Sequence, residues 1–272
     1  MTSSRDIMEM RRNKMIINEI STKPCYIEIY CNNILISKAT GFQIHHGHKY
    51  LITNWHVVSG RNFITNECLD TNCAIPDKII VTYKKYIDSD NYEWTKNEIN
   101  LFDSDGKPLW YEHPKYGHKV DVVALPLEMY PQCQHYKESF NLNTNYNLNV
   151  TDPVYVVGFP LGYTVKSKEE PHAVWTSGSV ATDPDLDMVI NDETLPAFLI
   201  DSRTRQGQSG SPVIYYSDAG IDLHHNGGRS MWGEPFMKEI GIYSGRIDKE
   251  SDLGYVWKWK VIKEIIESIN NQ

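Results

Sequence analysis

The chain has 272 residues, of which 40% are apolar and 23% charged, and its formal net charge is −8. These proportions are ordinary for a globular protein and exclude collagen-like and intrinsically disordered classes. Because nucleic-acid affinity depends on basic side chains that neutralise phosphates, the acidic balance argues against a nucleic-acid partner. No apolar run approaches the roughly 20 residues needed to span a bilayer, so we expect no membrane partner either.

The N-terminal stretch lacks the continuous apolar core and the small-residue cleavage site of a secretory signal, which predicts a cytoplasmic protein. Cysteine usage agrees with this prediction, because the number of cysteines is odd and none forms a C-x-x-C pair. We expect buried free thiols in a reducing compartment at the five positions Cys25, Cys31, Cys68, Cys73 and Cys133.

Apolar side chains recur at helical spacing over residues 7–20, so we predict an amphipathic helix inside an N-terminal segment spanning 1–23. After this segment come short runs rich in Ile, Val, Tyr and Thr, which predict strands. A first set of predicted strands covers 25–31, 34–44, 49–58, 78–85 and 120–127. A polar, Asn-rich link at 141–151 precedes a second set at 153–160, 172–182, 197–202, 211–216, 239–247 and 253–259.

The order of these strands predicts the fold class. No helical pattern alternates with the strands, so a parallel βαβ sheet is not expected. We predict an all-β fold with two small antiparallel barrels, spanning 24–140 and 152–259, followed by a C-terminal helix over 260–272. The whole chain, 1–272, is predicted to form one unit.

Residues 205–212 read RQGQSGSP and contain a candidate nucleophile, Ser209. Gly, Ser and Pro are turn formers, so this octapeptide alone indicates a turn. A serine nucleophile also needs a histidine base and, in most cases, a carboxylate that fixes the imidazole tautomer. His56 ends a strand-like run from which its ring can emerge at a barrel rim. Asp121 opens an otherwise apolar run, where an imidazole N–H would satisfy a buried carboxylate.

The glycines around Ser209 predict a second feature of such a site. Gly207 and Gly210 permit a tight turn that aims the amides of Gly207 and Ser209 at one point, where an oxyanion can be held. The order His, Asp, Ser is one of the known orders of a catalytic triad. An α/β-hydrolase would instead run Ser, Asp or Glu, His and would show G-x-S-x-G, where this chain has G-Q-S-G-S.

Three histidines, His45, His46 and His48, raise the question of a metal site. Zinc sites usually combine imidazoles with thiolates or carboxylates at defined spacing, and these histidines lie where a turn joins two predicted strands. We therefore predict neither a metal nor a cofactor.

The sequence resembles the trypsin-like serine peptidases, and most closely the compact bacterial branch that includes the HtrA/Deg-type protease domain. The resemblance covers roughly residues 25 to 268 and rests on runs that follow the family's order: ATGFQI, LITNWHVV, VDVVALPL, VVGFPLG, TSGSV, FLIDSRTRQGQSGSPVI, EIGIYSG and LGYVWKWKVIKEI. It implies two perpendicular six-stranded β-barrels, a triad in the cleft between them, and peptide-bond hydrolysis through an acyl-enzyme.

The resemblance also implies a role for each candidate residue. His56 matches the general base, Asp121 its orienting carboxylate and Ser209 the nucleophile, with the amides of Gly207 and Ser209 as the oxyanion hole. The strand position whose backbone pairs with the substrate is Ser244. The predicted substrate-binding residues are Arg203, Gln206, Ser244 and Gly245.

The chain departs from the family's usual Asp-Ser-Gly-Gly motif. Gln208 precedes Ser209 and cannot form an ion pair with a new N-terminus, so activation by N-terminal trimming is not expected. Ser211 replaces the second glycine. Arg203 lies six residues before Ser209, where trypsin has the acidic floor of its specificity pocket, and an arginine there would favour acidic side chains. HtrA/Deg-type proteins continue into a PDZ domain, which we do not expect here.

The sequence therefore predicts a bacterial, cytoplasmic serine endopeptidase that acts on a protein or peptide substrate. We expect narrow specificity or conditional activation, because the polar stretches 86–118 and 217–236 look like insertions on the barrel scaffold and no propeptide is visible. The alternative is a latent protease-like scaffold that binds peptides and is regulated by a partner protein.

Overall fold

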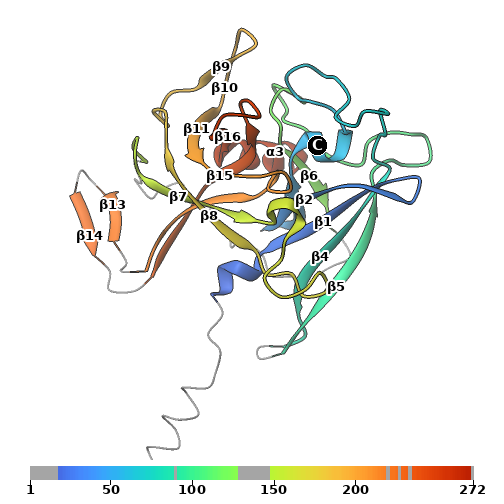
Figure 1. Ribbon diagram of the computed structural model, residues 1–272, viewed down its shortest axis with the longest axis horizontal. Coiled ribbons are helices and arrows are strands. Elements are labelled where there is room, and N and C mark those ends of the chain that lie inside the picture. The colour runs from blue at the N-terminus through green and yellow to red at the C-terminus, as the bar shows by residue number, and fades with distance from the viewer. Residues whose placement is uncertain are drawn as a thin grey trace, which may run out of the picture.

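The computed structural model describes residues 18–88, 91–127, 148–218, 221–225, 228–231 and 235–270. Strands dominate it, and they form two units that meet near the middle of the molecule (Figure 1). The predicted all-β fold class with two six-stranded antiparallel units is confirmed, and the second unit closes into a barrel. Most of the predicted N-terminal helix lies outside the described residues, and what is described of it is a short 3₁₀ helix, Glu19–Thr22.

The first unit is a six-stranded antiparallel sheet in the order β5-β4-β1-β2-β3-β6. Many of its buried side chains are β-branched or aromatic, among them Ile27, Ile79, Val81 and Tyr83. The strands are β1 (Pro24–Cys31), β2 (Ile34–His46), β3 (His48–Thr53), β4 (Lys78–Tyr86), β5 (Tyr92–Asn100) and β6 (Val123–Pro126).

The second unit is a closed barrel in the order β11-β16-β15-β12-β7-β8. Its strands are β7 (Pro153–Gly158), β8 (Val174–Val180), β11 (Ala197–Ser202), β12 (Pro212–Ser217), β15 (Phe236–Arg246) and β16 (Leu253–Lys258). Two hairpins project from it: β9 (Met188–Ile190) with β10 (Glu193–Leu195), and β13 (Ile221–His225) with β14 (Gly228–Met231).

Three local predictions were wrong. The stretch 86–118 was interpreted as a polar hairpin inserted on the scaffold; β5 does form a hairpin with β4, but as a full member of the first sheet rather than an insertion. The stretch 217–236, interpreted as a loop, contains the β13–β14 hairpin. His56 was placed at the end of a strand, but the strand stops at Thr53 and His56 lies in the short helix α2 (Trp55–Ser59).

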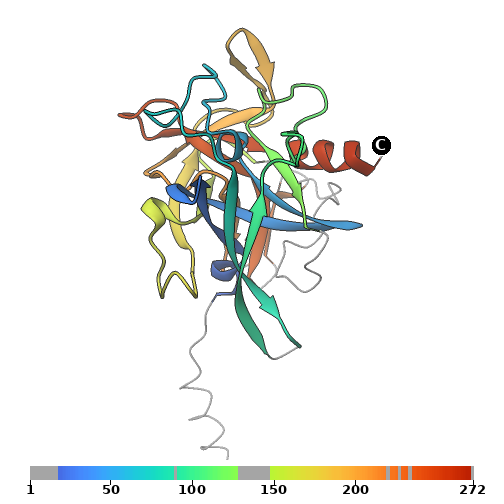
Figure 2. The ribbon, with the colours of Figure 1, turned by 90° about the vertical axis from the view of Figure 1, so that its right-hand side faces the viewer.

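The C-terminal helix α3 (Lys260–Asn270) agrees with the predicted one. Its apolar stripe is buried, and Figure 2 shows it packed beside the strands at the chain's end. The side chain of Glu264 reaches His113 of the first unit, with 2.7 Å between Oε2 and Nε2. One core cluster contains residues of both units and of this helix, including Phe42, Val122, Trp257, Val261 and Ile265. The two units are therefore joined by a shared hydrophobic core.

The prediction of free thiols was wrong for two cysteines, because Cys68 and Cys73 form a disulfide. Cys25 and Cys31 take part in no disulfide among the described residues, and of these two only Cys25 is buried. Cys133 lies outside the described residues. In the described part of the chain, no helix has both the length and the apolarity to cross a membrane.

Candidate active site

Helix α2 fixes the position of His56 at the edge of the first sheet. The helix starts after Asn54 and ends at Gly60, whose φ of 68° provides the left-handed C-cap and whose amide bonds the carbonyl of His56. Val57 and Val58 bury the opposite face. The side-chain Nδ2 of Asn54 donates to the backbone carbonyl of Asp121 at 2.7 Å, which ties the helix to the segment just before β6.

The carboxylate of Asp121 is fully buried and receives three hydrogen bonds. Its Oδ1 accepts the backbone N–H of His56 at 2.8 Å, and its Oδ2 lies 2.6 Å from Nδ1 of the same residue. The hydroxyl of Ser244 donates to Oδ2 as well. Because an ionised carboxylate only accepts, Nδ1 carries the proton and Nε2 is left as the basic nitrogen. The pairing of His56 with Asp121 expected from the sequence is therefore present.

Ser209 lies in the loop between β11 and β12, and two glycines shape that loop. Gly207 has φ +93° and Gly210 has φ +82°, values that side chains rarely adopt. A Cβ on Gly210 would lie 2.0 Å from the carbonyl oxygen of Thr40. Thr40 also holds the loop with polar contacts, because its amide donates to the carbonyl of Ser209 at 2.9 Å and its hydroxyl to that of Gly207 at 2.8 Å.

The amides of Gly207 and Ser209 have no hydrogen-bond partner among the described residues. The carbonyl before Gly207, that of Gln206, accepts the amide of Leu161 at 2.5 Å. In a trans peptide the C=O and the following N–H point in opposite directions, so the amide of Gly207 points away from Leu161. Two N–H groups of the loop that carries Ser209 are thus without a hydrogen-bond partner among the described residues.

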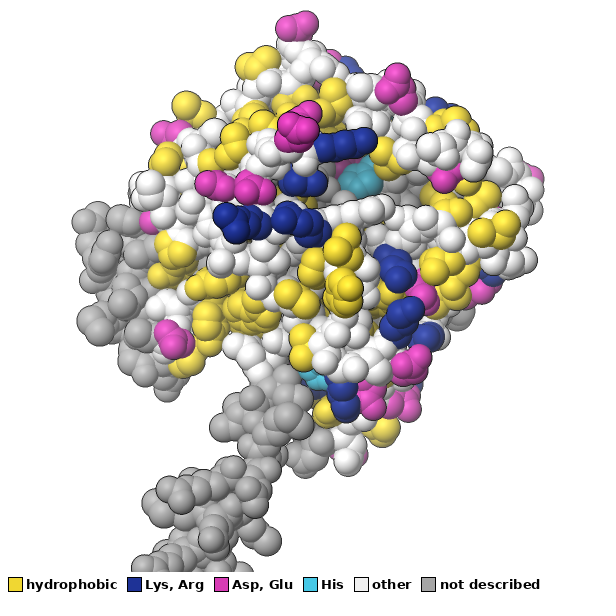
Figure 3. Space-filling model, viewed as in Figure 1, with side chains coloured by type: hydrophobic (Ala, Val, Ile, Leu, Met, Phe, Trp, Pro, Cys, Tyr) yellow, Lys and Arg dark blue, Asp and Glu magenta, His cyan; other side chains and the backbone are white. Residues whose placement is uncertain are grey.

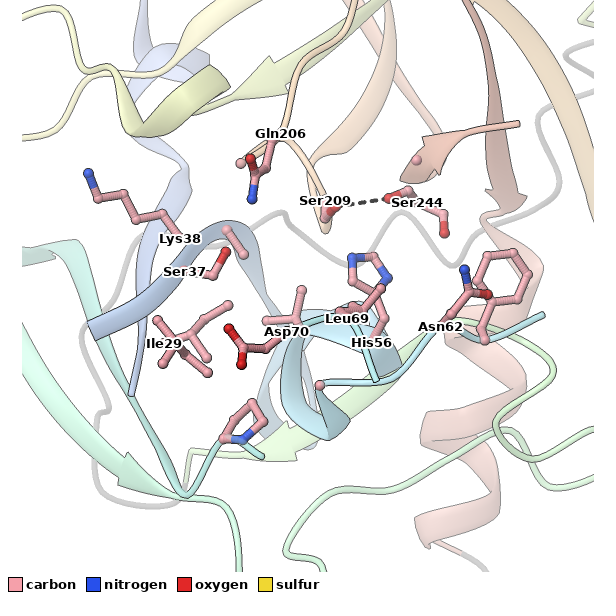
Figure 4. A pocket seen from close by; sticks show the side chains of 18 of the residues that line it. Ile29, Ser37, Lys38, His56, Asn62, Leu69, Asp70, Gln206, Ser209 and Ser244 are labelled. Atoms are coloured by element: carbon pink, nitrogen blue, oxygen red, sulfur yellow. Dashed lines mark hydrogen bonds between the residues drawn. The ribbon is translucent and has the colours of Figure 1, made fainter. Parts of the chain in front are cut away.

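The hydroxyl of Ser209 donates to the backbone carbonyl of Ser244 at 3.0 Å. Figure 4 shows this bond as a dashed line, with the imidazole of His56 facing Ser209 from the other side of the cleft. Among the described residues no hydrogen bond joins Ser209 to His56. The three predicted triad residues are thus brought to one place, with the serine hydroxyl turned toward Ser244.

A cavity of about 490 Å³ opens over these side chains, and its lining includes His56, Gly207, Ser209 and Ser244. Both units contribute to it, so it is the cleft between them. On the face shown in Figure 3, a histidine lies in a hollow beside Lys and Arg side chains. In the described part of the chain, no three His, Cys, Asp or Glu side chains gather as a metal site would require.

The two departures from the usual serine motif are accommodated by local contacts. Gln208 is fully buried, its Nε2 donates to Thr176 at 2.9 Å, and its Oε1 accepts the amide of Arg205 at 2.8 Å. This amide side chain therefore holds the loop from within the second barrel, without a charged N-terminus. Ser211 is packed against Gly158, where a Cβ would lie 2.0 Å from the serine oxygen.

The prediction that Arg203 forms the floor of a specificity pocket was wrong. Its side chain is 85% exposed, it does not line the cavity, and its Nε lies 3.8 Å from a carboxylate oxygen of Asp252. Tyr243, which does not line the cavity either, is 2% exposed, and its hydroxyl bonds that of Thr204. Of the other predicted substrate-binding residues, Gln206, Ser244 and Gly245 line the cavity.

A family model described as the trypsin-like peptidase domain matches residues 39–219, about two thirds of the chain. The chain belongs to this family. It is a trypsin-like serine protease, and the matched span contains His56, Asp121 and Ser209. A comparison with curated protein sequences found no match.

Two solved structures show the same fold as this protease. The serine endoprotease from Yersinia pestis superposes with a TM-score of 0.52 at 13% identity, over 93% of this chain and 64% of that one. The inactive form of a mutant of Rv3671c from M. tuberculosis superposes with a TM-score of 0.51 at 16% identity, over 96% of this chain and 92% of that one. At these identities the likeness concerns the fold.

Sequence reasoning missed several residues that shape the site of this protease. Thr40 was part of the quoted ATGFQI run, but its contact with the serine loop joins residues 167 positions apart in the chain. Tyr243 and Thr204 were also overlooked, because each looks like an ordinary strand or loop residue. No local pattern in the sequence could have paired their hydroxyls.

Proposed function

We propose that the protein is an endopeptidase that hydrolyses peptide bonds with His56, Asp121 and Ser209 as its triad. The observation that supports this most directly is the convergence of these three side chains on one cleft, with Asp121 buried beneath the imidazole. Asp121 fixes the ring and stabilises the imidazolium that forms during the reaction.

The first step requires a rotation of the serine hydroxyl. Ser209 leaves the carbonyl of Ser244 and donates its hydrogen bond to Nε2 of His56, which then takes the proton as the oxygen attacks the substrate carbonyl. The resulting oxyanion is bound by the free amides of Gly207 and Ser209, and such a donor typically lowers the barrier by about 3 kcal/mol. His56 next gives the proton to the leaving amine, and a water molecule hydrolyses the acyl-enzyme by the same route.

The substrate binds as an added strand on β15. The ladder between β12 and β15 ends at Ile242. Beyond Tyr243, Gly245 and Arg246 pair with β16 and Ser244 lies at a bulge, so among the described strands none pairs with the other edge of this stretch. An extended peptide can pair with such an open edge through its backbone. This places the scissile carbonyl beside Ser209, with Gln206 on the opposite wall.

We further propose that specificity is narrow. The hydroxyls of Tyr243 and Thr204 are bonded to each other and neither residue lines the cavity that contains Ser209, so the space for a substrate side chain behind the serine loop is restricted. A protease with this restriction acts on few sequences. Rapid, indiscriminate digestion of unfolded casein would contradict this part of the proposal.

The experiment that tests the proposed activity is intact-mass analysis after incubation with a fluorophosphonate. The probe needs an activated serine and a formed oxyanion hole but no knowledge of the substrate. We expect one adduct on the wild type and none on Ser209→Ala or His56→Ala. Failure of folded wild-type protein to form an adduct would contradict the proposal.

The second candidate function is a latent scaffold that binds peptides until a partner protein remodels it. The observation in its favour is the bond from Ser209 to Ser244, because a hydroxyl held there is not activated. Under this alternative the wild type binds peptides at the open edge of β15 but forms an adduct only when the partner is added.

A further inference from the structure

The cavity that contains Ser209 continues into a second cavity of about 240 Å³. Both cavities are lined by Ile36, Ser37, Lys38, Gln206 and Gly207. In Figure 4, Ser37 and Lys38 lie on one side of Ser209, and Ser244 lies on the other. The two cavities therefore form one groove, and its second part lies beyond the nucleophile as seen from Ser244.

The direction of the substrate follows from its pairing with β15. The residues before the scissile bond pair with the open edge at Ser244, which places the scissile carbonyl beside Ser209. The chain after the scissile bond must then continue away from Ser244. That path leads past Ser37 and Lys38 into the second cavity (Figure 4). The second cavity thus faces the leaving side of the substrate, meaning the residues that follow the scissile bond.

Exposed leucines line the second cavity from both units. Leu35 of β2 is 42% exposed, and Leu161, in the turn after β7, is 56% exposed. The approach to this cavity is apolar as well, because Ile29 lines the active-site cavity on the same side of Ser209 as Lys38 (Figure 4). Side chains of an extended peptide alternate between opposite faces. On the leaving side, both faces can therefore contact apolar surface.

The backbone of Leu161 has a conformation that few residues other than glycine adopt. Its φ is +53°, in the left-handed region. Its amide donates to the carbonyl of Gln206 at 2.5 Å, which ties this residue to the loop that carries Ser209. Such conformations cost stability and are concentrated at sites that hold ligands. The strained backbone therefore supports a binding role for the leucine side chain.

Lys38 is the charged residue that lines both cavities. Its side chain lies against the second unit, because a Cβ on Gly162 would overlap its Cδ and would lie 3.0 Å from its Nζ. The cross-strand neighbour of Lys38 is Glu28, and no ion pair joins the two. A half-buried lysine covers apolar surface with its methylene stem and keeps its ammonium near water. Lys38 therefore offers packing to an apolar side chain and repels a cationic one.

We propose that the second cavity binds the leaving side of the substrate and selects apolar side chains close after the scissile bond. Leu35 and Leu161 act as specificity residues, and Lys38 disfavours Lys and Arg at these substrate positions. The inference rests on the proposed peptidase function and names its substrate class. None of the three residues takes part in the proton transfers at Ser209.

Binding is tested first without turnover, on the Ser209→Ala protein. The probes are tetrapeptides with a free amino terminus and a fluorescent label at the carboxyl end, so they mimic the product released from the leaving side. Their first two residues are both Leu, both Ser or both Glu, and the rest is identical. By fluorescence anisotropy, we expect the Leu peptide to bind at least about tenfold more tightly than the Ser peptide, because leucine side chains lose contact with water. It should also bind more tightly than the Glu peptide.

Variants assign the preference to the two leucines. Leu161→Asn introduces a polar residue that tolerates a left-handed φ, and Leu35→Thr introduces one that suits a strand. Each should lower the Leu-to-Ser affinity ratio, and the double variant should bring it close to one. Leu186→Asn is the matched control, since Leu186 is 67% exposed and lines neither cavity. Lys38→Met keeps an apolar stem and should strengthen the binding of a peptide that begins with two lysines.

Cleavage by the wild type then locates the selected residues. In a library of peptides from a digested proteome, mass spectrometry should find apolar residues enriched at the first positions after the cuts, and Leu161→Asn should reduce that enrichment. Fluorophosphonate labelling of Leu161→Asn should match that of the wild type, because this probe places no peptide in the second cavity. A lost preference with equally impaired labelling would overturn the assignment of Leu161 as a specificity residue.

The binding experiment decides the inference independently of activity. Equal binding of the Leu and Ser peptides, no detectable binding of either, or tighter binding of the Glu peptide would overturn the selection of apolar residues. A ratio unchanged in the double variant would do the same. Because binding is measured on the Ser209→Ala protein, a Leu preference without any fluorophosphonate adduct on the wild type would uphold this inference while refuting the proposed activity.

Discussion

Ser209 hydrogen-bonds the backbone carbonyl of Ser244 at 3.0 Å, and that carbonyl lies on the edge of β15 where a peptide strand would be added. The same oxygen therefore has two competing donors, the nucleophile's hydroxyl in the free protein and a substrate N–H in the complex. Binding of a substrate would displace the hydroxyl and leave it free to turn to His56. Substrate binding and activation of the nucleophile are thus coupled through a single acceptor.

This coupling predicts the effect of methylating one substrate amide. Replacing the N–H of the residue before the scissile bond by N–CH₃ should lower kcat as well as raise KM, because Ser209 is no longer displaced. The loss of one hydrogen bond should lower kcat/KM by roughly two- to tenfold. Steady-state kinetics of the two peptides measure the effect. Methylating the adjacent amide, which points to the other side of an extended strand, is the control, and equal effects would contradict the coupling.

The buried carboxylate predicts a large loss in Asp121→Asn. An asparagine cannot fix the imidazole tautomer in the same way, so kcat should fall on the order of 10⁴-fold with little change in KM. Ser244→Ala removes one of the three donors to Asp121 and should have a much smaller effect. Rates of peptide hydrolysis for both variants provide the measurement. An Asp121→Asn enzyme that keeps most of its activity would refute the role proposed for the carboxylate.

The backbone at Gly207 predicts a loss of oxyanion binding in Gly207→Ala. The new Cβ would lie 2.5 Å from the carbonyl of Phe159 at a φ of +93°, so the loop must shift. Misplacing one amide donor should slow fluorophosphonate labelling by about 100-fold or more. Gly106→Ala is a matched control, because Gly106 has φ +76° but no atom within 4 Å of its added Cβ. That variant should lose about 1 kcal/mol of stability and label normally.

Buried tyrosines predict a decline of stability at alkaline pH. Burial raises the pKa of Tyr243 to about 12 and, together with Glu28 and Tyr30, that of Tyr26 to about 12, against about 10 in the unfolded chain. Between these values the unfolded state has lost protons that the native state retains. Each tyrosine should therefore remove on the order of 2 kcal/mol as pH rises from about 10 to about 12.

Urea unfolding over this pH range measures that decline, and Tyr243→Phe should show a smaller decline in the free energy of unfolding than the wild type. The free energy of unfolding should fall as the pH rises, because removing a tyrosine proton costs more in the native state, where the pKa is raised, than in the unfolded chain. If the free energy of unfolding of Tyr243→Phe fell with pH as steeply as that of the wild type, the pKa of Tyr243 would not be raised in the native state.

The disulfide between Cys68 and Cys73 predicts a modest effect of reducing agents. It closes a short loop that carries two residues of the cleft lining, Leu69 and Asp70. A loop of this size should contribute about 2 kcal/mol through the entropy of the unfolded chain. Cys73→Ser should lower the unfolding temperature, and reductant should then have no further effect on it. The free thiol Cys31 offers the control variant Cys31→Ser, whose response to reductant should equal that of the wild type.

Much of the fold could be predicted from sequence because its signals are local. Alternating apolar residues located strands such as β11, whose predicted and observed bounds coincide at Ala197–Ser202. β5 was missed because Tyr92–Asn100 is polar on both faces, and it is a strand only through its pairing with β4. α2 was missed because its five residues continue an apolar run, and a chain reversal at Gly60 decides between helix and strand.

For the site, too, the residues with a local sequence signal could be predicted and the contacts between distant segments could not. His56, Asp121 and Ser209 are recognisable because each lies in a distinctive run. The direction of the Ser209 hydroxyl, the hydroxyl pair of Tyr243 with Thr204 and the exposure of Arg203 depend on contacts between distant segments. A count of residues back from Ser209 led to Arg203 as the pocket floor. This count fails because the loop between the two residues can follow more than one path.

The core cluster shared by the two units lies under the cleft, and α3 is locked onto it by Glu264 and His113. Such a cleft has a fixed width, because separating its walls would expose the joint core to water. Only a locally extended segment can enter it and add to β15. In a folded target protein, the cut site must therefore lie in an exposed loop or in a segment that separates from the target's surface by local unfolding. The mobility of the target, as much as its sequence, then sets how fast it is cut.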